Sequence, residues 1–309
     1  MKAYIAKRIV QCLLVVFLVV TLVFFLMNMT GDPVRMMLGP EATEEEIEIV
    51  RQAMGLDKPL GVRYLIFLKN AVRGDFGASI SWKGKTALQV VLERLPASLQ
   101  LNGIAILWSS ALSIGLGILA AQHKGKLADK VISVVSLFGQ VAPGFWVGLL
   151  LMLLFAVRLK WLPPTGYGSW KNLVMPAIVM GLNPLASNTR LVRSCMLETM
   201  SQDYITTARA KGLRRSIILG RHCMRNVAIP LVTSMGQQIP TLIGGSAIVE
   251  TVFAWPGIGR LLIQSIGLRD YPVVQCSVCF TALAFVVINL AIDLLYGVLD
   301  PRVKLIKDK

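Results

Sequence analysis

Six long windows of the sequence contain no Asp, Glu, Lys or Arg, and they constrain the fold more than any other feature. They cover residues 9–30, 95–122, 131–157, 172–189, 226–249 and 271–292. A hydrocarbon core of about 30 Å takes roughly 20 apolar residues of helix, because the helix satisfies its own backbone hydrogen bonds. The sequence therefore predicts an all-α integral membrane protein with six transmembrane helices.

The composition supports lipid rather than water as the surroundings. Only 16% of the 309 residues are charged and 55% are hydrophobic. In a soluble domain about a quarter of the residues are charged. A water-soluble enzyme is therefore excluded. The net charge of +15 would indicate a nucleic-acid partner only if the basic residues shared one solvated face. They lie between the apolar windows instead, so we expect membrane lipid and no nucleic acid as partners.

The first window is interpreted as a retained anchor. Lys2, Lys7 and Arg8 precede it, as in a secretory signal, but its apolar stretch exceeds the usual length of about 7–15 residues. No small-x-small cleavage site precedes the next charged segment. Residues 1–30 are thus predicted to form the N-terminal tail and the first anchor.

Basic residues in the short connections predict the orientation, because they resist translocation. With the N-terminus in the cytoplasm, 18 Lys and Arg lie inside and 5 lie in the short outer loops. Both termini are then cytoplasmic. The predicted organisation continues with an extracytoplasmic helical segment at 31–94, a five-helix permease core at 95–302 with a cytoplasmic loop at 190–225, and a tail at 303–309.

The long outer segment carries signals for short helices. Thr43 and Glu46 have the spacing of a capping box. Amphipathic stretches follow at 60–72 and 86–95, and Pro96 is expected to separate the latter from the second span. The segment either covers the helix ends or docks an outer partner, and the sequence leaves both alternatives open.

Residues for metal chemistry are scarce. The two histidines, His123 and His222, lie in predicted cytoplasmic loops, so no His-rich metal site is expected. Cys276 and Cys279 share a helix face in the sixth span, and we interpret them as packing residues. The five cysteines are too few for a disulfide framework.

The chain has no recognisable site for ATP. The stretch at 84–86 (Gly-Lys-Thr) looks like the end of a phosphate loop, but Ser79 stands where that motif requires Gly. Ionisable groups in mid-membrane, which a proton or sodium relay needs, are also missing. We therefore expect no catalytic residue in this chain, and energy that comes from another subunit.

The fourth and fifth windows contain polar and helix-breaking residues. Such residues act as interhelical contacts or line a water-accessible path for a polar solute. Their clustering in two consecutive spans favours the path. The candidate path residues are Asn183, Asn188, Gln237, Gln238, Gly244 and Gly245.

The connection between these two windows is the most informative segment. Ser201 or Asp203 is expected to cap a short helix over 204–211, and Gly212 is expected to end it with a left-handed residue. Small and basic residues on this helix suit a partner surface. Composition alone favours the alternative of an ordinary basic loop.

The segments 204–212 (YITTARAKG) and 222–230 (HCMRNVAIP) resemble the coupling-loop signature of ABC importer permeases of the peptide and nickel group. Further motifs that resemble this group lie along nearly the whole chain, at 31–33 (GDP), 55–59 (GLDKP), 74–77 (GDFG), 253–259 (FAWPGIG), 269–275 (RDYPVVQ) and 300–302 (DPR). Gln202 departs from the acidic residue of the family pattern.

The resemblance implies a half-channel in a bacterial inner membrane that works by alternating access. Its implied partners are a homologous second permease subunit, two ABC ATPase subunits that bind ATP and Mg, and an extracytoplasmic solute-binding protein. The chain itself would bind no cofactor or metal. The residues implied to contact an ATPase are Asp203, Tyr204, Thr207, Ala208, Arg209, Ala210, Lys211, Gly212, Leu213 and Arg214.

The resemblance leaves the cargo open between peptides, glutathione, and nickel or metal chelates. The short outer loop at 158–171 looks more like the metal-chelate members, whereas peptides are the broader class. A non-transport membrane scaffold or receptor subunit is the alternative function. The polar breaks in the fourth and fifth windows argue against it.

Overall fold

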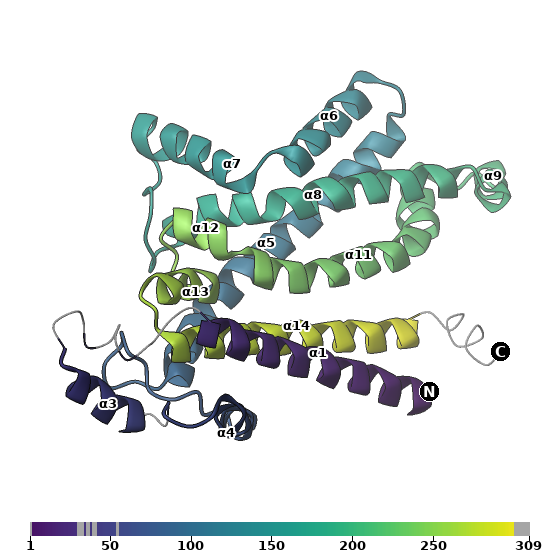
Figure 1. Ribbon diagram of the computed structural model, residues 1–309. Helices are drawn as coiled ribbons and strands as arrows, with labels where there is room; N and C mark the ends of the chain where they lie inside the picture. Colours follow the sequence, from purple (N-terminus) through teal and green to yellow (C-terminus); the bar gives the residue numbers. More distant parts are fainter. Residues whose placement is uncertain (1, 30–33, 35–37, 39–41, 54–55, 300–309) are drawn as a thin grey trace. The chain divides into compact units, whose positions relative to one another are not determined.

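The computed structural model describes residues 2–29, 34, 38, 42–53 and 56–299 (Figure 1). Within these ranges every regular element is a helix, and the one strand-like pairing is an isolated antiparallel bridge between Ala78 and Thr86. The all-α prediction is therefore confirmed. The chain forms two compact units, Met1–Ser98 with Pro256–Val287 and Leu99–Trp255 with Ile288–Lys309.

The first unit contains the N-terminal helices and most of the last one. Its elements are α1 (Lys2–Met29), α3 (Glu44–Ala53), α4 (Leu60–Val72), the start of α5 (Ala87–Gln122), α13 (Ile258–Gly267) and most of α14 (Tyr271–Leu299). Helix α1 exposes Val10, Leu13 and Leu22 by 63%, 65% and 60%. Apolar exposure on this scale suits contact with lipid.

Two of the helical stretches predicted for residues 31–94 form separate short helices, α3 and α4. The Thr43 backbone N–H donates to Glu46 Oε2 at 2.9 Å, and the Glu46 N–H donates to Thr43 Oγ1 at 3.3 Å, so the capping box before α3 is confirmed. Helix α4 has the predicted bounds of 60–72. It packs on α1 through Phe67 and Phe24, whose ring centroids lie 5.2 Å apart.

The prediction that Pro96 separates two helices is wrong. Helix α5 runs without interruption from Ala87 to Gln122 with Pro96 inside it. A proline removes one backbone hydrogen bond from a helix interior. Burial of Val90 and Val91 before it, and of Ala97 after it, offsets that loss.

The second unit is built around α8 (Trp170–Met200). Figure 1 shows α8 with α6 (Leu127–Val141) and α7 (Gly144–Leu151) on one side and α11 (Met224–Gly245) on the other, and α8 contacts each of them. The unit also contains the rest of α5 and the end of α14. Its other elements are the π-helical turns η1 (Met152–Arg158) and η2 (Ile218–Cys223) and the short helices α9 (Asp203–Ala210), α10 (Arg215–Ile217) and α12 (Ala247–Val252).

Glycine permits a close approach between α5 and α8. A Cβ atom at Gly117 would lie 2.6 Å from the Cβ of Val192, and one at Gly181 would lie 2.3 Å from the Trp108 ring. The Trp108 indole N–H donates to the Ala177 carbonyl at 2.9 Å, which fixes the ring. Small residues are the usual means of bringing membrane helices together.

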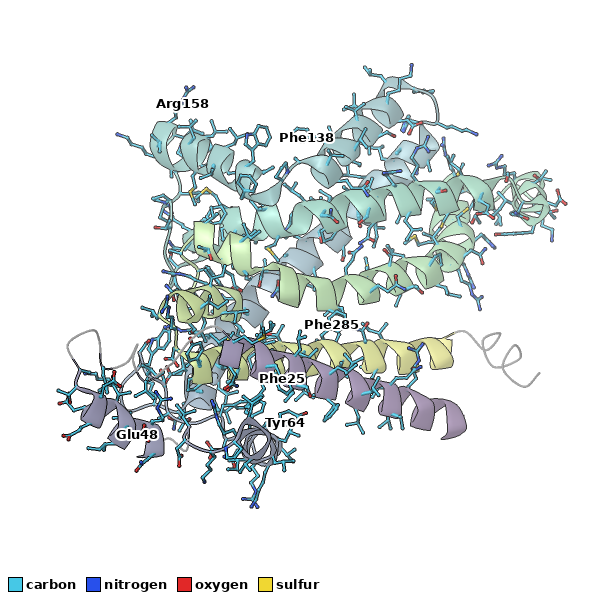
Figure 2. All side chains as sticks on the ribbon, in the orientation of Figure 1. Phe25, Glu48, Tyr64, Phe138, Arg158 and Phe285 are labelled. Atoms are coloured by element: carbon cyan, nitrogen blue, oxygen red, sulfur yellow. The ribbon has the colours of Figure 1, made fainter. Side chains whose placement is uncertain are left out.

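The third window is bent rather than straight. The helices on either side of Ala142 and Pro143 meet at 107°. Ala142 is extended (φ −66°, ψ 128°), because a residue before proline avoids the helical region. The Phe138 ring, labelled in Figure 2, packs edge-on against Trp146 across the break, with centroids 6.1 Å apart.

In the part of the chain that the structure describes, three helical segments are long and apolar enough to cross a membrane, namely Arg8–Met29, Ala87–Gln122 and Tyr271–Ile292. The bent pair Leu127–Val141 and Gly144–Arg158 makes a fourth if it counts as one span. The windows at 172–189 and 226–249 lie mainly in α8 and α11. These two helices are not among the segments that are long and apolar enough to cross a membrane. The count of six stays a prediction.

Candidate functional site

The candidate site is the connection between α8 and α11, which we call the α8–α11 loop (residues 201–223). Helix α9 begins after Gln202, whose extended backbone (φ −75°, ψ 148°) turns the chain into the helix. Neither predicted cap forms, because no side chain caps the start of α9. The Ser201 hydroxyl instead donates to the Glu198 carbonyl at 2.7 Å.

The end of α9 has the predicted left-handed residue. Gly212 has φ +74°, and its N–H donates to the Arg209 carbonyl at 2.9 Å. The Leu213 N–H donates to the Ala208 carbonyl at 3.3 Å. These two bonds form a Schellman motif, in which glycine avoids the strain that a Cβ atom would cause. Helix α9 therefore stops sharply, as the sequence predicts.

Helix α9 has one buried and one exposed face. Ile205 and Ala208 are buried in an apolar cluster with Val192, Met196 and Val227 of α8 and α11. The remaining residues assigned to the site are exposed in this chain, namely Asp203, Tyr204, Thr207, Arg209, Ala210, Lys211, Gly212, Leu213 and Arg214. The burial of Ile205 and Ala208 joins α9 to the bundle and leaves its polar face accessible.

Polar contacts also hold the loop to the bundle. The Asn226 side-chain amide donates to the Tyr204 hydroxyl at 2.6 Å, which joins α9 to the start of α11. The Arg215 guanidinium donates to the Gln122 carbonyl at 3.3 Å, which joins α10 to the end of α5. A displacement of α9 would thus be transmitted to several helices.

An ion pair lies between α6 and α8. Arg193 Nε and Nη2 donate to the two Asp129 carboxylate oxygens at 2.5 and 2.8 Å, and the Gly125 N–H donates to Asp129 Oδ2 at 2.9 Å. These donors, Arg193 foremost, lower the pKa of Asp129 from its ordinary value of 3.8 to about 2. Local sequence does not indicate this pair, because its members are 64 positions apart.

The structure brings two of the candidate path residues together. Asn188 is 1% exposed, and its amide exchanges hydrogen bonds of 3.1 and 3.0 Å with the amide of Gln238. The Ser234 hydroxyl donates to Asn188 Oδ1 at 2.8 Å. These contacts tie α8 to α11. Asn188 and Gln238 therefore act here as interhelical contacts, which is one of the two alternatives that the sequence leaves open.

The other candidate path residues are placed differently. Asn183 and Gln237 are exposed in this chain. Gly244 and Gly245 lie in α11, outside the residues whose surroundings the structure describes. Among the described residues, no group of three or more His, Cys, Asp or Glu side chains could hold a metal ion.

Comparison with known proteins identifies the family. A family model described as "Binding-protein-dependent transport system inner membrane component" matches residues 113–305, and the corresponding N-terminal model matches residues 1–102. The chain belongs to this family. The permease is thus a membrane component of an ABC importer and not itself an ATPase. It is a multi-pass protein of the bacterial inner membrane.

Relatives cover the whole permease. It is 38% identical over 305 residues to the glutathione transport system permease protein GsiC of Escherichia coli, which covers 98% of this chain and 99% of the relative. The GsiC protein of Shigella dysenteriae matches with the same identity and coverage. This similarity places the permease in the dipeptide and oligopeptide group.

A solved structure shows a similar fold. The inward-facing MetNI methionine ABC transporter matches with a TM-score of 0.56 and 15% identity, over 69% of this chain and 97% of that chain. At this identity the likeness concerns the fold alone.

Proposed function

We propose that this permease carries peptides into the cell by alternating access, driven by ATP hydrolysis on two partner ATPases. Its six spans would leave both termini in the cytoplasm. A homologous second permease would complete the channel, and an extracytoplasmic solute-binding protein would deliver the cargo. The observation that carries the proposal is the two-faced structure of α9, with Ile205 and Ala208 buried in the bundle and the polar face exposed.

Helix α9 is suited to transmit force because it has fixed contacts on its inner side. The apolar cluster around Ile205 connects it to α8 and α11, and the Tyr204 and Arg215 hydrogen bonds connect the loop to α11 and α5. Helices packed in this way move as rigid bodies. Closure of an ATPase cleft on the exposed face would then tilt these helices together and open the other side of the channel.

Peptides are the favoured cargo because the full-length relative GsiC is a glutathione permease, and glutathione is a tripeptide. Nickel and metal chelates remain the alternative cargo. The ATPase activity of the purified complex distinguishes the two. We expect stimulation by a binding protein loaded with glutathione or a dipeptide, and none by one loaded with a nickel chelate.

The coupling role of α9 is tested by Gly212→Val. A Cβ-branched residue is strained at φ +74°, so the Schellman motif should open and α9 should lose its position. We expect the variant complex to reach the membrane in normal amount but to lose uptake, by tenfold or more. Uptake of labelled cargo into cells and the amount of complex on a blot are the two measurements.

Gly220→Ala is the matched control. Gly220 lies in the same loop and has no positive φ, and a Cβ atom added there would meet no other atom within 4 Å. Uptake by this variant should stay within about twofold of the unaltered permease. Normal uptake by Gly212→Val would rule out the coupling role. Stable assembly without any ATPase chain would favour the scaffold alternative instead.

A further inference from the structure

A cavity of about 620 Å³ lies in the second unit between α6 and α8, which Figure 1 shows side by side. Leu137 and Leu191 are the apolar residues among the eight that line it. The other six are polar or charged, namely Ser133, Gln140, Ser187, Arg190, Arg193 and Ser194. The cavity has the usual volume of a ligand site, and its lining suits a polar ligand.

The α8 side of the cavity belongs to a polar stripe. Asn183, Ser187, Arg190 and Ser194 follow one another at steps of four, three and four positions, so they share one face of the helix. Asn183, which is a candidate path residue, is exposed, and so are Arg190 and Ser194. In membrane helices, ionisable residues face a bundle interior or a water-filled cavity and mark substrate pathways. This face of α8 is therefore suited to a path for a polar solute.

Arg190 provides the charge of the cavity. The other cation, Arg193, is already paired with Asp129. Arg190 Nη1 donates to Gln140 Oε1 at 2.6 Å, and within the part of the chain that the structure describes this is the polar contact of its side chain. A guanidinium has further N–H donors in the same plane. Gln140 thus orients a cation that has no acidic partner among the described residues.

We propose that Arg190 binds a carboxylate of the peptide cargo in this cavity. The inference rests on the proposed function, because it takes the cargo to be a peptide. An unmodified peptide ends in a carboxylate, and a guanidinium binds a carboxylate through two parallel hydrogen bonds. One cation without an acidic partner matches one such group. The cavity lies along the half of α8 that leads to α9, so in the proposed orientation the contact is made on the side where the cargo leaves.

The test measures protection of a cysteine in the cavity. Ser194→Cys, in a chain without its five native cysteines, is purified with the partner subunits in the nucleotide-free state. Its reaction with a maleimide is followed by mass spectrometry of this chain as the concentration of S-methylglutathione is raised. We expect this peptide, whose sulfur does not react with maleimide, to slow the reaction. The analogue in which both carboxylates are amides should have no effect.

Two substitutions test the carboxylate contact in different ways. Arg190→Gln removes the cation and should raise the peptide concentration for half protection by about tenfold or more, because hydrogen bonds to charged groups contribute on this scale. Gln140→Glu keeps Arg190 but places a carboxylate where Gln140 Oε1 now accepts its hydrogen bond. This internal carboxylate should compete with that of the cargo and weaken protection to a similar extent.

Each change has a matched control. Arg225→Gln removes a cation at the start of α11, and Gln264→Glu adds an acid on α13, at exposed positions outside the cavity lining. Neither should change the concentration for half protection. Ser201→Cys places the probe at an exposed position outside the lining, where the peptide should not change its rate. The substituted cavity residues are themselves exposed, so these changes should leave the fold intact.

The ATPase activity of the same samples separates this inference from the proposed function. If a peptide-loaded binding protein stimulates the ATPase but the peptide does not protect Ser194→Cys, the carboxylate site is wrong and the proposed function stands. Protection without stimulation would support the site and contradict the proposed function. Equal protection by the amide analogue would remove the role of the Arg190 charge. Protection by phosphatidylglycerol but not phosphatidylcholine in nanodiscs, with no effect of the peptide, would assign the cavity to a lipid headgroup.

Discussion

At the scale of single residues, the ion pair between Asp129 and Arg193 connects α6 to α8. The Asp129 side chain is 6% exposed and that of Arg193 is 30% exposed. Removal of one partner leaves the other charge poorly compensated. We expect Asp129→Asn to lower the free energy of unfolding by about 1–3 kcal/mol. Thermal unfolding in detergent measures the loss.

The stability lost in Asp129→Asn should also depend on pH. Arg193 and the Gly125 N–H lower the pKa of Asp129 to about 2 in the folded chain, from 3.8. The stabilisation is therefore present above about pH 4 and is lost as the pH falls toward 2. The stability difference between the unaltered chain and Asp129→Asn should be constant from pH 7 to 5 and should shrink below 4. A difference that does not change down to pH 3 would contradict the assignment.

Glu93→Gln is the control for this prediction. Glu93 pairs with Lys85 at 2.6 Å, but their side chains are 52% and 42% exposed. An exposed pair contributes at most about 1 kcal/mol. Both variants remove one negative charge from an ion pair, but only the Asp129 carboxylate is buried. A larger loss of stability in Asp129→Asn than in Glu93→Gln is therefore an effect of burial.

At the scale of elements, two prolines in predicted spans have different outcomes. Pro143 follows an extended residue and ends α6 with a bend of 107°, whereas Pro96 lies inside an unbroken α5. The local rule is the same at both positions. Buried side chains on both sides of Pro96 hold the helix together, and this packing could not be predicted from local sequence.

The start of α14 depends on one buried carboxylate. Asp270 Oδ2 accepts hydrogen bonds from the Ser79 hydroxyl at 2.6 Å and the Ser81 N–H at 2.9 Å, and Asp270 Oδ1 accepts from the Val273 N–H at 3.3 Å. Asp270→Ala removes the acceptor of these three donors, of which the Ser79 hydroxyl and the Val273 N–H are buried. We expect the free energy of unfolding to fall by about 2–3 kcal/mol. Hydrogen exchange at Ser81 should become faster, which mass spectrometry measures.

Asp75→Ala is the comparison for that change. Asp75 is exposed and accepts one bond, from the Gly77 N–H at 3.0 Å. In Asp75→Ala the free energy of unfolding should fall by about 1 kcal/mol or less. Unchanged exchange at Ser81 in Asp270→Ala would show that the carboxylate does not hold the loop.

At the scale of the whole molecule, alternating access requires that some path residues change their exposure between states. We expect Asn183→Cys and Gln237→Cys, in a chain without its five native cysteines, to react with a maleimide at rates that differ several-fold between nucleotide-free and ATP-trapped complexes. Both positions are exposed in this chain. Ala186→Cys, at a position that is 2% exposed, should stay protected in both states. If the maleimide rate at each of these two positions is the same in both nucleotide states, neither position lies in the path.

The sequence by itself determined the features that depend on local or repeated patterns. The helical class follows from windows without charge, the capping box at Thr43 follows from spacing, and the end of α9 follows from Gly212. Helix periodicity and caps depend on neighbours within a few positions. The short motifs along the chain were also sufficient to indicate the family.

Only the tertiary structure decided which distant side chains meet. It pairs Asn188 with Gln238 and Asp129 with Arg193, and it forms the cavity that Arg190 and Gln140 line. A polar residue in a span can face a path or a neighbouring helix, and its local sequence is the same in both cases. The choice depends on the packing of whole helices, which is the sum of many contacts between segments far apart in the chain.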